Sequence, residues 1–92
     1  MAILHQVALH PEDQLAWESL ATACVVGDTV VFLDAAVAKA CALPCWEHDG
    51  VRVCVPRAEL IDGGALPQSF DLIDDGQWCE LIVAHELIQH WM

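Results

Sequence analysis

Cysteines are the side chains of this sequence best suited to covalent chemistry, and five are present: Cys24, Cys41, Cys45, Cys54 and Cys79. A cysteine reacts as its thiolate, which needs partial exposure and a nearby cation or helix N-terminus. Cys54 and Cys79 fall in a predicted strand and a predicted helix, where burial is the expected fate. Cys24, late in the first predicted helix, and Cys45, in an acidic loop, are therefore the two candidate sulfur carriers.

The spacing of Cys41, Cys45 and His48 suggests a possible zinc site. That spacing is loose, however, and no second ligand pair follows at the distance typical of zinc fingers or ribbons. Burial of Cys41 in a helix explains that residue without a metal. No glycine-rich nucleotide-binding motif follows any predicted strand. We therefore predict neither a metal nor an organic cofactor.

Charge and hydrophobic content restrict the classes of partner. Fourteen Asp and Glu residues stand against three Lys and Arg, for a formal net charge of −11. Nucleic-acid binding depends on Lys and Arg that neutralise phosphates, so we expect no direct nucleic acid binding by this chain alone. Apolar residues make up 57% of the sequence. The core of one small domain needs fewer apolar residues than this. Some of them are therefore expected to lie on the surface and to contact a partner.

The thiols and the N-terminal residues predict a cytoplasmic protein. An odd number of cysteines argues against a closed disulfide framework and fits a reducing compartment. The first residues have neither the basic region nor the small-residue cleavage site of a signal peptide. No segment approaches the roughly 20 consecutive apolar residues of a membrane-spanning helix, so no membrane association is expected.

Four β-branched apolar segments alternate with helical patterns along the chain. The predicted strands are residues 3–7, 29–33, 51–55 and 70–73. Strands that alternate with helices predict right-handed crossovers and a mostly parallel sheet with helices on both faces. We therefore predict a single domain over residues 1–92 with a three-layer α/β/α fold and a sheet of about four strands.

Ligand sites of open α/β sheets lie beyond the carboxyl ends of the strands. In this sequence those ends carry His10, Asp34, Arg57 and Asp74. Asp34 precedes a predicted helix over residues 35–42, and Asp74 has capping-box spacing to Gln77. Helix capping explains both aspartates without a ligand.

The segment after Asp74 is predicted to be a helix that runs to the C-terminal residue. Its apolar residues go most of the way round: Trp78, Cys79, Leu81, Ile82, Val83, Leu87, Ile88 and Trp91. A helix that is apolar on nearly every side is buried on nearly every side, so one side would pack on the sheet and another on a partner. Trp78, Ile88 and Trp91 are the predicted interface residues, and the isolated chain is expected to form a homo-oligomer.

Three segments together carry a resemblance to a known family. The first strand contains Ile3, Leu4 and His5; the first helix contains Glu18, Ser19 and Leu20, and Gly27 and the second strand follow it. The closing segment is the most telling, with Asp74 after a strand, Trp78 opening the helix, and a final run of Gln89, His90, Trp91 and Met92. Over nearly its whole length the chain resembles the TusB/DsrH family, the smallest of the DsrE/DsrF/DsrH-like sulfur-relay subunits.

The resemblance implies a DsrEFH-like fold and a mainly architectural role in a hetero-oligomer with TusC/DsrF-like and TusD/DsrE-like subunits. In such complexes the TusD/DsrE-like subunit carries the principal sulfur-accepting cysteine. The complex would deliver persulfide sulfur for 2-thiolation of the tRNA wobble uridine or, in sulfur-oxidising bacteria, handle sulfur from stored or reduced compounds. Two positions depart from the family pattern: Leu20 stands where some relatives have a cysteine, and Ala35 where a glycine is common.

Two alternatives to a non-catalytic subunit remain open. In the first, the chain is a cysteine-persulfide sulfurtransferase of sulfur oxidation that uses its own Cys24 or Cys45. Cys24 lies one turn after Leu20 on the same predicted helix face. It could therefore take the place of the cysteine that some relatives have at the position of Leu20. In the second, the chain is a stand-alone homo-oligomeric α/β module with no role in sulfur chemistry.

Overall fold

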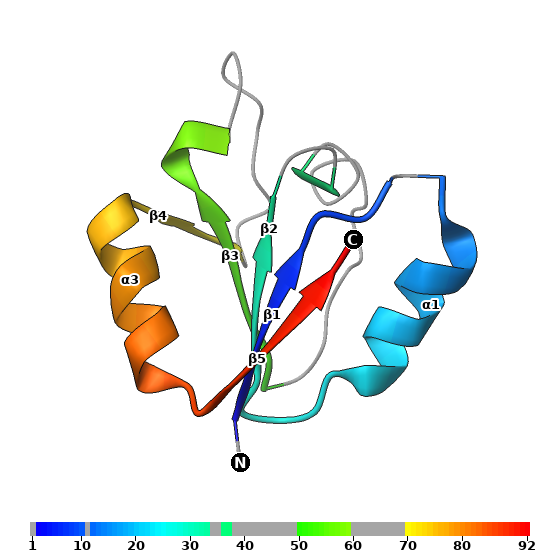
Figure 1. Ribbon diagram of the computed structural model, residues 1–92, viewed down its shortest axis with the longest axis horizontal. Coiled ribbons are helices and arrows are strands. Elements are labelled where there is room, and N and C mark those ends of the chain that lie inside the picture. Colours follow the sequence, from blue (N-terminus) through cyan, green and yellow to red (C-terminus); the bar gives the residue numbers. More distant parts are fainter. Residues whose placement is uncertain (1, 11, 34–35, 38–49, 60–69) are drawn as a thin grey trace.

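Five parallel strands form one sheet, with a helix of ten residues on each of its faces (Figure 1). The computed structural model describes residues 2–10, 12–33, 36–37, 50–59 and 70–92. The strands are β1 (Ile3–Val7), β2 (Thr29–Phe32), β3 (Arg52–Pro56), β4 (Phe70–Ile73) and β5 (Leu87–Trp91). Their order is β4-β3-β2-β1-β5, so β1 lies between β2 and the C-terminal edge strand. The α/β class with a parallel sheet is confirmed.

Four of these strands occupy the segments that the sequence predicts. β1 and β4 have the predicted bounds, and β2 and β3 differ from theirs by one residue. Every residue of β2 is buried, which explains its continuous apolar sequence, because a strand covered on both faces shows no alternation. A short 3-10 helix, η1 (Arg57–Glu59), follows β3.

The first helix, α1 (Gln14–Ala23), lies over one face of the sheet. The carboxylate of Asp13 begins it by accepting a hydrogen bond from the backbone N–H of Ala16 at 3.3 Å, as expected of an N-cap residue. Trp17, Leu20 and Cys24 lie at helical spacing on one face of α1, and all three are in the core.

The second long helix, α3 (Asp75–Ala84), lies over the opposite face (Figure 1). It begins with the predicted capping box. Asp74 Oδ1 accepts a hydrogen bond from the N–H of Gln77 at 2.7 Å, and Gln77 Oε1 accepts one from the N–H of Asp74 at 2.9 Å. These reciprocal bonds satisfy two backbone donors at the start of the helix.

Two apolar clusters fill the space between the sheet and the helices. Strand residues alternate between the two faces, and the sets divide accordingly. The α1-side cluster includes Val7, Trp17, Leu20, Val30, Phe32, Val53, Val55 and Phe70. The α3-side cluster comprises Leu4, Val31, Cys54, Ile73 and Leu81. Phe32 lies at the centre of an aromatic stack, with its ring centroid 5.5 Å from that of Trp17 and 6.0 Å from that of Phe70.

The prediction of a helix through residue 92 is wrong beyond Ala84. At His85 the backbone becomes extended (φ −107°, ψ 134°), and the ring Nδ1–H donates to the carbonyl oxygen of Leu81 at 2.7 Å. The other ring nitrogen, Nε2, accepts a hydrogen bond from Thr29 Oγ1 at 3.1 Å. β5 then pairs with β1 from Leu87 to Trp91, so the sheet has five strands rather than about four.

Two further expectations about the C-terminal segment are also wrong. Helix α3 is not buried on nearly every side, because Leu81 is its one buried residue and Val83 is 86% exposed. Cys79, predicted to be buried, is exposed, whereas Cys54 is buried as predicted. The apolar surface of α3 that does not face the sheet is therefore open to solvent in the isolated chain.

Candidate functional site

A histidine and an aspartate form a polar pair inside the apolar core on the α1 side of the sheet. His5 lies in β1 and Asp28 immediately precedes β2, and their side chains are 2% and 0% exposed. His5 Nε2 is 3.0 Å from Asp28 Oδ2. The parallel pairing of β1 with β2 brings these residues together, because its register sets Leu4 opposite Thr29.

The Asp28 side chain connects β1 to the loop between α1 and β2 by hydrogen bonds. Its Oδ1 accepts a hydrogen bond from the N–H of Ile3 at 3.0 Å, and its Oδ2 accepts one from the N–H of Val25 at 3.1 Å. Burial by itself raises the pKa of this carboxyl, but the hydrogen bonds from His5, Ile3 and Val25 outweigh burial and hold the pKa below its usual value. Asp28 is therefore a carboxylate at neutral pH.

Trp91, from the C-terminal strand, completes this group of side chains. Its indole Nε1–H donates to His5 Nδ1 at 3.1 Å, and the two ring centroids are 6.1 Å apart. Because Nδ1 accepts this bond, the hydrogen-bond pattern assigns the imidazole proton to Nε2, from which it is donated to Asp28. We call Asp28, His5 and Trp91 the His5 network; it links β5 through β1 to the start of β2.

The chemistry open to the His5 network is limited by its burial. In many acid–base sites a carboxylate binds one ring nitrogen of a histidine and orients the ring. The second ring nitrogen then faces the substrate. Here that second nitrogen, Nδ1, is occupied by Trp91, and the pair is closed to solvent. The arrangement therefore supports a structural role, in which buried polar groups satisfy one another and fix the position of β5.

The His5 network was not predicted from the sequence, although two signals for it were present. His5 interrupts an apolar strand, and a buried polar side chain needs a partner. Asp28 directly precedes a strand in which every residue is buried. Neither signal identifies the partner, because Asp28 is 23 positions from His5 in the sequence and Trp91 is 86 positions from it.

Of the two predicted sulfur carriers, Cys24 lies at the C-cap of α1 and is 5% exposed. Burial, and after it the negative charge of Asp28, raises the pKa of the Cys24 thiol to about 11. Burial raises the pKa of Cys54 to about 11 as well; Arg52 works against this shift and Asp71 adds to it. Both side chains are therefore thiols at neutral pH, and a thiol is a poor nucleophile.

The second predicted carrier, Cys45, lies outside the described residues. So do Cys41 and His48, which form the possible zinc site with Cys45, and so does Asp34. Within the described part of the chain, no three His, Cys, Asp or Glu side chains gather as metal ligands.

The three predicted interface residues fall on two elements. Trp78 lies in α3, half-buried against the α3-side cluster, and its buried Nε1 has no hydrogen-bond partner among the described residues. Ile88 lies in β5 and is 38% exposed. Trp91 packs against the α1-side cluster and donates to His5, so it contributes to the fold of the single chain.

Two of the residues predicted at the carboxyl ends of the strands lie close together. Arg57 and Asp74, with Ala58 and Asp75, line a hollow of about 280 Å³ between η1 and the start of α3. The Asp74 carboxylate is already used in the capping box. At the end of β1, the carbonyl oxygen of His10 accepts a hydrogen bond from Trp17 Nε1 at 3.0 Å, which ties this loop to α1.

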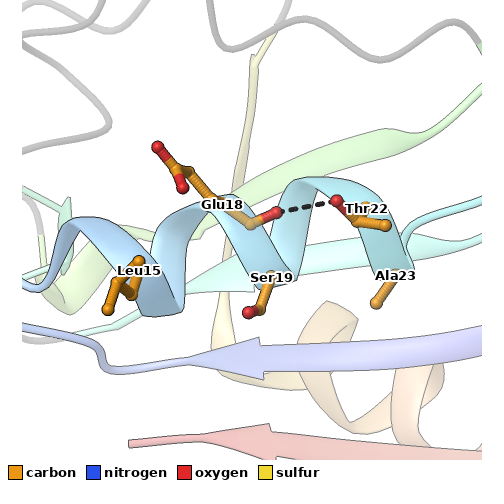
Figure 2. A pocket seen from close by; sticks show the side chains of 5 residues that line it. All are labelled: Leu15, Glu18, Ser19, Thr22 and Ala23. Atoms are coloured by element: carbon orange, nitrogen blue, oxygen red, sulfur yellow. Dashed lines mark hydrogen bonds between the residues drawn. The ribbon is translucent and has the colours of Figure 1, made fainter.

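A second hollow, of about 620 Å³, follows the outer side of α1 (Figure 2). Leu15, Glu18, Ser19, Thr22 and Ala23 line it, and the Thr22 hydroxyl donates to the carbonyl oxygen of Glu18 at 3.0 Å. Apart from Glu18 this surface is uncharged. In the view of Figure 2, Leu15, Ser19 and Ala23 point to the side of the helix on which β1 and β5 lie. We call these five residues the α1 stripe; its composition suits protein contact better than catalysis.

Replacing Trp91 with phenylalanine is expected to lower the free energy of unfolding by about 1–2 kcal/mol. The substitution keeps an aromatic ring but removes the N–H that the buried Nδ1 of His5 accepts. Urea unfolding followed by circular dichroism measures the change, with His90→Ala on the exposed side of the same strand as the control. A Trp91→Phe protein as stable as the natural one would show that this hydrogen bond makes no net contribution.

No protein-family model matches the chain, and no curated protein matches it significantly. Among the described residues, no helix combines the length and the hydrophobicity needed to cross a bilayer.

Proposed function

We propose that this chain is an architectural subunit of a sulfur-relay complex, with TusC/DsrF-like and TusD/DsrE-like partners. The complex delivers persulfide sulfur, most simply for 2-thiolation of the tRNA wobble uridine. The sequence resemblance to the TusB/DsrH family supplies the pathway. The parallel sheet with a helix on each face is compatible with the three-layer DsrEFH-like fold that the resemblance implies.

The observation that carries the architectural role is the state of Cys24. Sulfur passes between proteins when a thiolate attacks the outer sulfur of a persulfide; the new S–S bond forms as the old one breaks and the donor leaves as a thiolate. With a pKa of about 11, only about one Cys24 side chain in a thousand is a thiolate near pH 8. Its burial also keeps a partner's persulfide away.

The scarcity of basic residues in this chain supports a complex in which other subunits bind the tRNA. The sequence contains three Lys and Arg residues, and one of them, Arg52, is engaged with Asp71, with Nε 2.8 Å from Oδ2. A tRNA substrate needs a basic surface to neutralise its phosphates. In the proposed complex the partner subunits therefore hold the tRNA.

Co-purification from the native cell tests the proposal. A tagged chain should retain two related small α/β proteins, at least one of which gains the mass of a sulfur atom when a cysteine desulfurase and cysteine are added. Recovery of this chain alone would favour the stand-alone module. A sulfur adduct on this chain, with loss of transfer in Cys24→Ser or Cys45→Ser while the complex still assembles, would favour the sulfurtransferase of sulfur oxidation.

Among the cysteines that the structure describes, alkylation of the folded protein should separate the buried Cys24 and Cys54 from the exposed Cys79. Near pH 8, iodoacetamide should modify Cys79 at least about tenfold faster than Cys24 or Cys54, because the latter two are buried and lack thiolate character. Peptide mass spectrometry measures each rate, and unfolding in guanidinium should bring the three rates together. Rapid labelling of Cys24 in the folded chain would remove the main support for an architectural role.

A further inference from the structure

The C-terminal strand leaves one side of its backbone without a described partner. β5 pairs with β1 on one side, and no other described strand adjoins it. Natural edge strands are commonly protected from further pairing by charged residues, proline or a bulge. The opposite edge strand, β4, carries Asp71, whereas β5 contains no Asp, Glu, Lys, Arg or Pro. Leu87 and Ile88 are 48% and 38% exposed.

The register identifies which backbone groups of β5 are available. The carbonyl oxygen of Trp91 accepts a hydrogen bond from the N–H of Ala8 at 2.7 Å, so the backbone groups of Trp91 face β1. In a parallel pair, residues alternate between facing the neighbouring strand and facing away from it. Leu87 and Gln89 therefore also face β1, while the N–H and C=O groups of Ile88 and His90 point away from the sheet.

We propose that β5 pairs antiparallel with β5 of a second copy of this chain, about a two-fold axis that passes through Gln89. In this register Ile88 lies opposite His90 of the second copy, and the two residues exchange both backbone hydrogen bonds. Gln89 meets its own copy at a non-hydrogen-bonded position, where Cα atoms are closest. The two sheets thereby become one continuous sheet. This pairing does not depend on a role in sulfur transfer.

The placement of charged side chains and the symmetry of the pairing favour a second copy as the occupant. The two-fold register sets the Glu86 side chain of each chain opposite the Met92 side chain of the other, so no two charged side chains lie opposite each other along the ladder. A two-fold axis perpendicular to the sheet keeps both α1 helices on the same face.

Salt dependence distinguishes a second copy from a basic protein partner. Each chain carries a net charge of −11, so two copies repel at long range and salt screens that repulsion. Sedimentation of the natural chain should therefore show a monomer–dimer equilibrium that shifts toward dimer as salt increases. A monomer at all concentrations up to about 100 μM would overturn the proposal, and so would capture only by basic proteins in a complex that salt weakens.

Two substitutions test the edge itself. His90→Pro removes an outward N–H without removing a β1–β5 hydrogen bond, and Ile88→Lys adds the charge that protects natural edge strands. Each should weaken dimerisation at least about tenfold, while circular dichroism shows a folded chain. Val83→Lys makes the same charge change at a site that is 86% exposed on α3 and should dimerise like the natural chain. Equal dimerisation by all four proteins would overturn the proposal.

Cross-linking tests the register without relying on a loss of affinity. Non-hydrogen-bonded antiparallel pairs place Cα atoms within the range that a disulfide spans. In a background with Cys41, Cys45 and Cys79 replaced by serine, Gln89→Cys should therefore form a covalent dimer under mild oxidation. Val83→Cys in the same background is the exposed control and should remain largely monomeric on a non-reducing gel. Equal cross-linking at the two positions would contradict a two-fold axis at Gln89.

Discussion

Replacing Asp28 with alanine is expected to lower the free energy of unfolding by at least about 3 kcal/mol, because one buried and two partly buried donors lose their acceptor at once. These donors are His5 Nε2 and the backbone N–H groups of Ile3 and Val25. A buried donor left without a partner costs its full desolvation energy. The loss is large against the total stability of about 5–15 kcal/mol typical of a small domain.

Urea unfolding measures this loss, and a second aspartate provides the control. Asp71 forms an ion pair with Arg52 in which the two side chains are about half exposed, at 54% and 50%. Such pairs contribute about 0–1 kcal/mol, so Asp71→Ala should have little effect. If Asp28→Ala were no more destabilising than Asp71→Ala, the His5 network would not stabilise the fold.

The same carboxylate gives stability a defined dependence on acid. The pKa of Asp28 is lower in the folded chain than its usual value of about 3.9. Its contribution is therefore complete above that ordinary value and is lost as pH falls through the lower pKa of the folded chain. The difference in stability between the natural chain and Asp28→Asn should be constant above about pH 5 and shrink below about pH 4. A difference that shrinks only above neutral pH would contradict this assignment.

Replacing Phe32 with alanine is expected to destabilise the domain by about 3–5 kcal/mol. The ring is fully buried and stacks with Trp17 and Phe70, so truncation leaves a cavity between α1 and the centre of the sheet. In thermal unfolding, a loss of this size lowers Tm by at least about 12 °C in a domain of this length.

An exposed apolar residue provides the comparison for Phe32. Leu15 is 77% exposed on the α1 stripe, and Leu15→Ala should change stability by less than about 0.5 kcal/mol. If both truncations produced similar small changes, the packing of Phe32 against α1 would be much looser than the stacked rings indicate.

Local patterns in the sequence were enough to place most of the sheet and the starts of the helices. β1 to β4 follow from short runs rich in β-branched and apolar residues, and β2, in which every residue is buried, is apolar or β-branched throughout. The capping box of Asp74 and Gln77 is likewise local, since the two residues satisfy each other across one turn. The spacing of Trp17, Leu20 and Cys24 likewise places these three residues on one face of a helix.

Only the tertiary structure decided the C-terminal segment and the polar core. The apolar residues from Trp78 to Trp91 suit a helix locally, but β1 has an edge that β5 satisfies with five residue pairs. Hydrogen bonding of an otherwise unpaired strand outweighs the weak preference of Leu87 to Trp91 for either structure. His5 and Asp28 become partners for the same reason: parallel pairing of β1 and β2 brings them within 3.0 Å, and no local pattern records a contact made between strands.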